Sequence, residues 1–179
     1  MIVNIKKASR KRLPVFERMM QLYLYDFSEI EGFDVDREGL FRPGPSRLES
    51  YWTDPDRFPF LIYANSKIAG FVLVNDYTCL EENAGAKSIA EFFVMRKYRR
   101  RGIGKAAAFL VFDRFPGKWE VRQIRSNLDG YHFWKRVIAE YTENRFTETF
   151  LDERTWRGPV QSFDNSAKIA LHKKTTRPL

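Results

Sequence analysis

The sequence has 179 residues and contains very little cysteine or histidine. Its one cysteine, Cys79, cannot form an internal disulfide, which agrees with a reducing compartment. A base for that thiol would have to be His132 or His172, the two histidines of the chain. We therefore interpret Cys79 as a small buried residue rather than a nucleophile.

Membrane and secretion signals are also missing. No apolar run approaches the length that crosses a bilayer. Residues 1–5 are followed at once by Lys6 and Lys7, which is not the order of regions in a signal peptide. The sequence therefore predicts a soluble, cytoplasmic protein without a membrane partner. Its length predicts a single domain over residues 1–179.

Charge is present in excess and is unevenly distributed. The net charge is +8, and cations concentrate at residues 6–12 and 96–105. One stretch is instead acidic and contains Asp26, Glu29, Glu31, Asp34, Asp36 and Glu38. A basic site for an anionic cofactor and an acidic site for a cationic acceptor would both fit this polarity. Ordinary solvated surface charge is the alternative for the acidic stretch.

The hydrophobic pattern predicts a mixed α/β fold. A helix should begin after Ser9 and end within residues 26–30, leaving the acids in a loop before a segment rich in Pro and Gly. Strands are expected at residues 2–5, 58–63, 68–77, 88–94, 119–124, 146–151 and 160–163, and further helices at 47–52, 106–115 and 127–141. This order predicts a mostly antiparallel sheet with one parallel pair.

The most informative stretch spans residues 94–105. It holds six cations and no acid, and it joins an apolar strand to an amphipathic helix. The first turn of a helix presents unpaired N–H groups and a partial positive charge, so this loop is predicted to bind an anion. Gly102 and Gly104 remove side chains that would keep a diphosphate from the backbone, and arginines can close over it.

The loop contains the pattern Arg99-x-x-Gly102-x-Gly104. It is neither a P-loop, which needs a Lys-Ser/Thr pair, nor a dinucleotide fingerprint, which needs a third glycine. It resembles the acyl-CoA-binding loop of the GNAT superfamily of N-acyltransferases. A second segment, Asn127-x-x-Gly130-x-x-Phe133-Trp134, is similar to a later motif of that family. The resemblance covers residues 58–141 and is strongest over residues 88–134.

The resemblance implies a fold and a cofactor site. The fold is α/β, of the α+β kind, with a mixed central sheet whose fourth and fifth strands splay apart and which helices flank on both faces. Val94 would offer backbone hydrogen bonds to the pantetheine of acetyl-CoA, and Asn127 would contact the same molecule. Trp134 occupies the position of a tyrosine beside the CoA sulfur. The diphosphate would be held by Arg99, Arg100, Arg101, Gly102, Ile103, Gly104 and Lys105.

Acyl transfer to an amine needs a base that takes the ammonium proton. Glu91 lies in an otherwise apolar strand just before Val94 and is the predicted base, with Glu120 as a weaker alternative and a solvent-facing side chain as the competing interpretation. Because the indole of Trp134 cannot act as an acid, either Tyr131 or another group protonates the leaving thiolate, or it departs unassisted. His132 is expected to be a surface or packing residue.

Two other functions compete with the transferase prediction. The predicted activity is direct transfer of acetyl from acetyl-CoA to a primary amine in a ternary complex, without a metal. Asp26 and Glu29 are the predicted contacts of a cationic acceptor. The alternatives are an acyl-CoA sensor or scaffold of the same fold and a nucleic-acid binder, against which the two-glycine loop argues. The sequence leaves a homodimer open.

Overall fold

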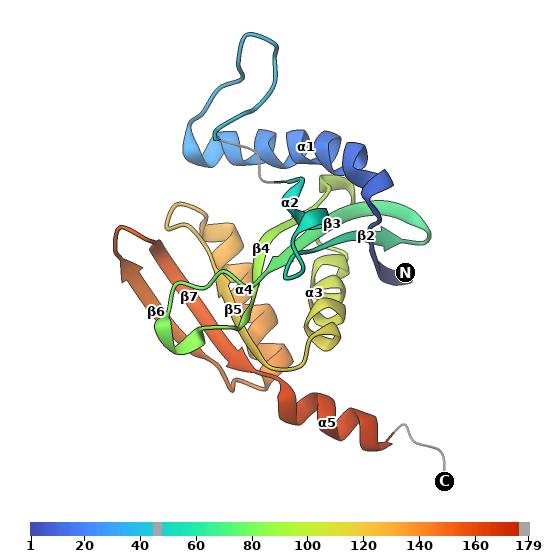
Figure 1. The fold of residues 1–179 in the computed structure, drawn as a ribbon, viewed down its shortest axis with the longest axis vertical. Coiled ribbons are helices and arrows are strands. Elements are labelled where there is room, and N and C mark those ends of the chain that lie inside the picture. The colour runs from blue at the N-terminus through green and yellow to red at the C-terminus, as the bar shows by residue number, and fades with distance from the viewer. Residues whose placement is uncertain (45–47, 176–179) are drawn as a thin grey trace. The chain divides into compact units, whose positions relative to one another are not determined.

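The computed structural model describes residues 1–44 and 48–175 (Figure 1). Within this part of the chain, seven strands form one sheet in the order β1-β2-β3-β4-β5-β7-β6. The strands are β1 (Val3–Lys7), β2 (Phe58–Ala64), β3 (Lys67–Asn75), β4 (Lys87–Val94), β5 (Lys118–Arg122), β6 (Thr147–Asp152) and β7 (Arg157–Asp164). The sheet is mostly antiparallel, and β4 and β5 form the parallel pair. The fold class expected from the sequence is confirmed.

Helices flank this sheet. They are α1 (Leu13–Glu31), α2 (Ser50–Thr53), α3 (Ile103–Arg114), α4 (Leu128–Thr142) and α5 (Ser166–Thr175), with short 3-10 turns at Arg10–Arg12, Glu81–Asn83 and Arg96–Tyr98. None of the described helices is long and apolar enough to cross a membrane.

The chain divides into two compact units. The first contains residues 1–74 and 91–104, and the second contains residues 75–90 and those from 105 onward. Strand β4 contributes to both. Its parallel register with β5 joins Lys87–Ile89 to Trp119–Val121 and stops there, whereas β4 continues to Val94. The prediction of one domain over residues 1–179 stays a prediction.

In the first unit, α1 covers β3 and β4 through aromatic side chains. Phe16, fully buried, lies 5.7 Å from the ring centre of Phe71 on β3. Tyr23, two turns further along the helix, lies 5.9 Å from the ring of Phe93 on β4. The predicted apolar stripe of this helix therefore forms, and it places one helical face against the strand that carries Glu91.

The start and the length of α1 differ from the prediction. Ser9 precedes a 3-10 turn and its side chain makes no capping bond, so α1 begins only at Leu13, where Pro14 suits a first turn. The helix then continues to Glu31 and ends at Gly32. Asp26 and Glu29 are consequently on the helix and not in a loop.

The β2–β3 hairpin forms as predicted, with Asn65 and Ser66 at positive φ in its two-residue turn. The register shifts near Ile62, which pairs with Gly70 while Tyr63 pairs with Ile68. This irregularity leaves Ala69 unpaired in the β2 ladder, and its carbonyl instead accepts a 2.9 Å bond from the Met95 N–H. Beside the bulge, β3 is thus bonded to the residue that follows β4.

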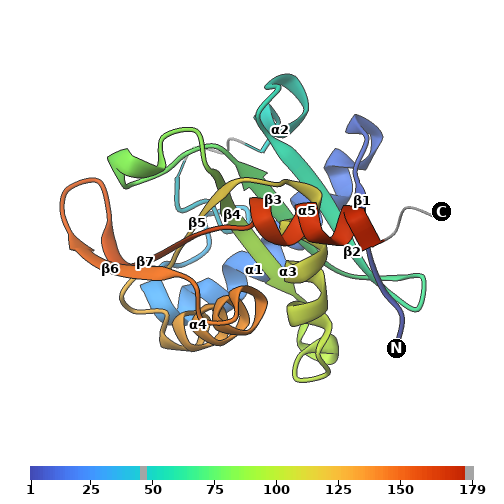
Figure 2. The same ribbon diagram turned by 90° about the horizontal axis from the view of Figure 1, so that it is seen from below.

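The second unit has an aromatic core. Phe112 on α3 is fully buried and contacts the rings of Trp119 at 4.9 Å, Phe163 at 5.0 Å and Tyr141 at 5.0 Å. Helix α5 runs on from β7, as Figure 2 shows. This last helix is absent from the sequence-based expectation. Of the predicted helix at 47–52, residue Arg47 lies outside the described residues, and α2 begins at Ser50.

Candidate functional site

The predicted basic loop connects β4 to α3. Strand β4 ends at Val94, a 3-10 turn follows at Arg96–Tyr98, and α3 begins at Ile103. Between them, Arg100 has φ 57° and Gly102 has φ 77°, both left-handed. Left-handed residues beside right-handed ones turn successive N–H groups toward one side, and such concavities bind anions. The local structure therefore has the features of an anion site at a helix N-terminus.

The cations of this loop differ in what they contact. Arg100 and Arg101 are exposed, and neither makes an ion pair within the part of the chain that the structure describes. Arg99 instead pairs with Asp26 on α1 and donates from Nε to the Val94 carbonyl at 2.7 Å. Lys105 pairs with Glu140 at 2.7 Å through two half-exposed side chains, a contact of small energy. Arg100 and Arg101 are thus more readily available to an anion than Arg99 and Lys105.

The end of β4 is fixed by a close approach of β3. A Cβ on Gly70 would lie only 2.0 Å from the Phe93 carbonyl oxygen and 3.1 Å from the Val94 Cα. No side chain fits between these backbones, so glycine at position 70 is a steric requirement. Val94 is itself almost fully buried. The backbone that is predicted to contact pantetheine is therefore held from β3 as well as by Arg99.

Glu91 contacts α1. Its Oε2 accepts a hydrogen bond of 2.5 Å from the Tyr23 hydroxyl. Burial, with the negative charge of Glu91 as the next cause, raises the pKa of Tyr23 well above its ordinary value. The phenol therefore stays protonated and acts as a donor to the carboxylate. Glu91 is half-buried, and its side chain contacts α1. A side chain that only faces solvent was the competing interpretation.

Asp26 lies on the same helix and holds two cations of the basic segment. Arg96 approaches its Oδ1 at 2.8 Å, and Arg99 contacts its Oδ2. The Asp26 side chain is only 17% exposed. Two guanidinium groups offset its charge, so its field on a cationic acceptor is weaker than that of a solitary carboxylate.

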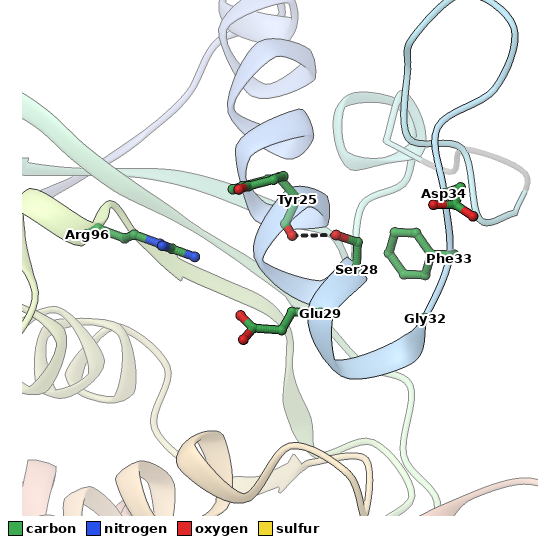
Figure 3. A pocket seen from close by; sticks show the side chains of 7 residues that line it. All are labelled: Tyr25, Ser28, Glu29, Gly32, Phe33, Asp34 and Arg96. Atoms are coloured by element: carbon green, nitrogen blue, oxygen red, sulfur yellow. Dashed lines mark hydrogen bonds between the residues drawn. The ribbon is translucent and has the colours of Figure 1, made fainter.

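An open hollow of about 490 Å³ lies at the end of α1. It is lined by Tyr25, Ser28, Glu29, Gly32, Phe33, Asp34 and Arg96. In Figure 3, the Glu29 and Arg96 side chains reach into the same space, and Ser28 bonds back to the Tyr25 carbonyl at 2.7 Å. Glu29 is among the charges that raise the pKa of Arg96, after the larger effect of Asp26. The hollow therefore combines aromatic, anionic and cationic walls.

Asn127 and Trp134 belong to the second unit. The Asn127 side chain caps α4 by accepting from the Gly130 N–H at 2.9 Å, and a Cβ on residue 130 would meet Asn127 Nδ2 at 2.6 Å. Trp134 is 6% exposed and packs 6.2 Å from the Phe112 ring. Both side chains therefore have structural contacts, and their predicted roles toward CoA stay predictions.

Tyr131 is held by two charged neighbours. Its hydroxyl donates to Glu148 at 3.1 Å and accepts from Lys135 at 2.9 Å. Burial raises the pKa of Glu148, but bonds from Gln161 and Lys135 outweigh that effect and leave it below its ordinary value. Tyr131 is therefore bound to an ionised carboxylate. His132 is exposed, as expected.

Glu120, the weaker candidate base, is completely buried. It accepts hydrogen bonds from the Cys79 N–H at 2.6 Å, the Leu80 N–H at 3.2 Å and the Asn83 amide at 3.1 Å. By accepting these three bonds, the Glu120 carboxylate holds residues 79–83 in place. Within the described residues, no three His, Cys, Asp or Glu side chains are grouped as a metal site would require.

Two residues that hold the site, Tyr23 and Gly70, are not among the site residues predicted from the sequence. There, Tyr23 is only one member of an apolar stripe, and Gly70 is only part of a strand. A glycine inside a strand pattern is a general signal of close backbone approach and could have marked position 70. Nothing local marks Tyr23, because its partner Glu91 lies 68 positions away.

Solved structures with a similar fold are acetyltransferases. One from Thermus thermophilus has a TM-score of 0.67 and 14% identity, with 92% of this chain and 97% of that chain covered. The PaiA N-acetyltransferase of Thermoplasma acidophilum, solved with coenzyme A, has a TM-score of 0.55 and 14% identity, with 92% of this chain and 99% of that chain covered. The spermidine N-acetyltransferase of Vibrio cholerae, solved with CoA and spermine, has a TM-score of 0.60 and 12% identity, with 94% of this chain and 98% of that chain covered.

At such identities these likenesses establish the fold alone. No curated protein matches the sequence. The family model of the acetyltransferase (GNAT) family, however, matches residues 16–138, which is more than half of the chain and includes most of α1, the basic loop and most of α4. The protein therefore belongs to the GNAT acetyltransferase family.

Proposed function

We propose that this protein transfers an acetyl group from acetyl-CoA directly to a primary amine while both are bound. The observation that carries the proposal is the loop between β4 and α3. It combines two left-handed residues, a helix N-terminus and the exposed cations Arg100 and Arg101. Membership of the acetyltransferase family and the CoA held in structures of similar fold support the same activity.

The residues of this loop suit the diphosphate of CoA. The backbone N–H groups of Gly102, Ile103 and Gly104 would donate hydrogen bonds to phosphate oxygens, because they lie at the N-terminus of α3. Arg100 and Arg101 would add charge-assisted contacts, and Lys105 would join them from its exposed pair with Glu140. Arg99 would act at the edge of the anion while it holds the Val94 carbonyl.

Acetyl-CoA, once bound, supplies a thioester carbonyl that a neutral amine can attack. An amine acceptor is mostly an ammonium ion near neutral pH, so a proton must leave before attack. The Glu91 carboxylate takes that proton in our proposal. Tyr23 donates a hydrogen bond to Oε2 of Glu91 and so holds one oxygen of the carboxylate in place.

The departing thiolate needs little help from this chain. A thiolate is a tolerable leaving group near neutral pH, and Trp134 has no acidic proton to give. Tyr131 is the remaining candidate acid, but its hydroxyl already donates to Glu148. We therefore propose that the thiolate leaves without a dedicated acid from α4.

The acceptor is proposed to be cationic. Glu29 and Asp34 place two carboxyl side chains in the wall of the hollow at the end of α1. Asp26 lies on the same helix, with its charge shared by Arg96 and Arg99. A spermidine N-acetyltransferase of similar fold has been solved with spermine, a polycation, which supports this class of acceptor.

The loop assignment is tested by calorimetry with acetyl-CoA. Replacing Arg100 and Arg101 together by Ala is expected to weaken binding at least tenfold, because each charge-assisted bond contributes about 1.5–3 kcal/mol. Arg37→Ala serves as the matched control, since Arg37 is exposed and lies outside the loop. Equal affinity in all three proteins would contradict the assignment.

Transfer itself is tested with a panel of polyamines, amino sugars and peptides. Release of free thiol above the rate of spontaneous hydrolysis is expected for at least one amine. Tight acetyl-CoA binding without turnover on any amine would favour a sensor or scaffold, the alternative that Trp134 at the tyrosine position suggests.

A further inference from the structure

We propose that Tyr23 is the positioning residue of the catalytic base: its hydroxyl holds the Glu91 carboxylate in one orientation for proton transfer. The inference rests on the proposed function, since it assigns a second residue to the same reaction. It does not follow from the family motifs, which lie on β4, the basic loop and α4, whereas Tyr23 lies on α1.

The geometry begins with strand periodicity. Glu91 and Phe93 are two residues apart on β4, so their side chains lie on the same face of the sheet. Tyr23 contacts both: its hydroxyl lies 2.5 Å from Glu91 Oε2, and its ring centre lies 5.9 Å from that of Phe93. One side chain of α1 therefore spans the two residues of β4 that precede the basic loop on this face.

The Tyr23 ring is held on three sides. It packs against Phe27 at 4.5 Å, one turn along α1, and edge-on to Phe71 of β3 at 5.9 Å, in addition to Phe93. A phenol confined by three aromatic rings has few rotamers left, so its hydroxyl is fixed before any ligand arrives. Because this fixed hydroxyl is bonded to Glu91 Oε2, it also limits the rotation of the carboxylate.

The hydrogen bond also has a fixed direction. Since burial and the charge of Glu91 raise the pKa of Tyr23 far above its ordinary value, the phenol keeps its proton at any working pH. Tyr23 is thus a permanent donor. A base fixed by such a donor is pre-organised, and orientation of a catalytic group affects the rate of the chemical step more than substrate affinity.

The test is a double-mutant cycle on steady-state kinetics. Tyr23→Phe keeps the ring and removes only the hydroxyl. We expect it to lower kcat about tenfold while the KM for acetyl-CoA stays within about twofold. In a Glu91→Gln background the same substitution should change kcat less than about twofold, because there is no longer a base to position.

Two further variants test whether the effect of Tyr23→Phe comes from its contact with Glu91. Tyr63→Phe is the matched control: Tyr63 is on β2 outside the site, so kcat should not change. Glu91→Asp shortens the side chain by one methylene, so its carboxylate lies farther from the hydroxyl of the unchanged Tyr23. It is expected to lose about as much kcat as Tyr23→Phe, and the combination should be little worse than either alone. If Tyr23→Phe does not fold, Tyr23→Met, which also removes the hydroxyl, takes its place in both cycles.

The outcomes separate the inference from the function on which it rests. Full additivity of Tyr23→Phe and Glu91→Gln, or of Tyr23→Phe and Glu91→Asp, would overturn the positioning role while transfer stands. Unchanged turnover in Glu91→Gln would remove Glu91 as the base and Tyr23 with it. Absence of transfer in the parent protein would overturn the proposed function and this inference together.

Discussion

The two carboxylates on neighbouring strands, Glu91 on β4 and Glu120 on β5, have opposite surroundings. Glu120 is fully buried and accepts three N–H bonds that hold residues 79–83. Glu91 is half-buried and receives a short bond from the Tyr23 hydroxyl. Sequence alone ranks Glu120 below Glu91 as a candidate base but does not indicate what surrounds either side chain. The difference shows that a carboxylate in a strand can be a structural acceptor or a candidate base according to the donors that surround it.

The physical distinction lies in the cost of removing each charge. A buried carboxylate with three N–H donors cannot be replaced without leaving some donors unpaired in an apolar region. The partly exposed Glu91 accepts from the Tyr23 hydroxyl, and the oxygen of a glutamine at position 91 can still accept this hydrogen bond. Substitution at Glu120 should therefore affect folding, and substitution at Glu91 should affect turnover.

Glu120→Gln is expected to have the largest effect on stability. The amide NH₂ would face the donors that now point at a carboxylate oxygen, and the free energy of unfolding should fall by about 3 kcal/mol. Urea denaturation followed by circular dichroism measures this. The control is Glu91→Gln, which should cost less than about 1 kcal/mol. Equal losses in the two variants would remove the distinction between the carboxylates.

Glu91→Gln is expected to have the largest effect on turnover. Loss of a general base typically slows a reaction by about 10²-fold or more, so kcat should fall by about that factor. Acetyl-CoA affinity, measured by calorimetry, should stay within about twofold. A loss in affinity as large as the loss in kcat would assign Glu91 to cofactor binding and not to proton transfer.

Gly70→Ala tests the backbone that carries Glu91 without touching its side chain. The new Cβ would lie 2.0 Å from the Phe93 carbonyl oxygen, so β3 and β4 must separate. We expect a stability loss of about 1–3 kcal/mol together with weaker acetyl-CoA binding, because the Val94 backbone shifts. Ala69→Gly, at the adjacent position, is the control. Unchanged acetyl-CoA affinity in Gly70→Ala would separate Val94 from the cofactor site.

The smallest expected effect concerns the acceptor. Asp26→Asn with Glu29→Gln should lower kcat/KM for a cationic acceptor about threefold and leave acetyl-CoA affinity nearly unchanged. The loss should shrink at high salt, since the Debye length is about 8–10 Å at physiological ionic strength. Comparing the single variants isolates Glu29, because Asp26 also holds Arg96 and Arg99. A preferred acceptor that is anionic would contradict the prediction.

Sequence reasoning succeeded where the signal is local. The order of strands and helices, the hairpin at Asn65 and the strand–loop–helix around Gly102 follow from patterns within about 20 residues, and each is confirmed. Helix α5 was missed because residues 166–175 have little amphipathic pattern. The last turn of α1 lacks a clear apolar pattern, since Ser28, Glu29 and Glu31 are polar, although glutamate favours a helix.

The contacts that define the candidate site are instead long-range. Tyr23 bonds to Glu91 across 68 positions, and Asp26 meets Arg99 across 73. Pairs of this kind depend on which face of α1 meets β4, and a single sequence does not specify that docking. The sequence therefore names candidate residues for the chemistry, which stay predictions, but it does not indicate which side chains hold them.

The left-handed backbone at Arg100 has a consequence for improving this protein by mutation. A side chain at φ 57° is strained by about 1 kcal/mol relative to glycine, so Arg100→Gly is a natural choice for raising heat resistance. That same change would delete one of the two exposed arginines that the loop offers to an anion. Selection for thermal stability alone would thus drift toward variants that hold an anion less well, and selection for activity would restore the arginine and its strain.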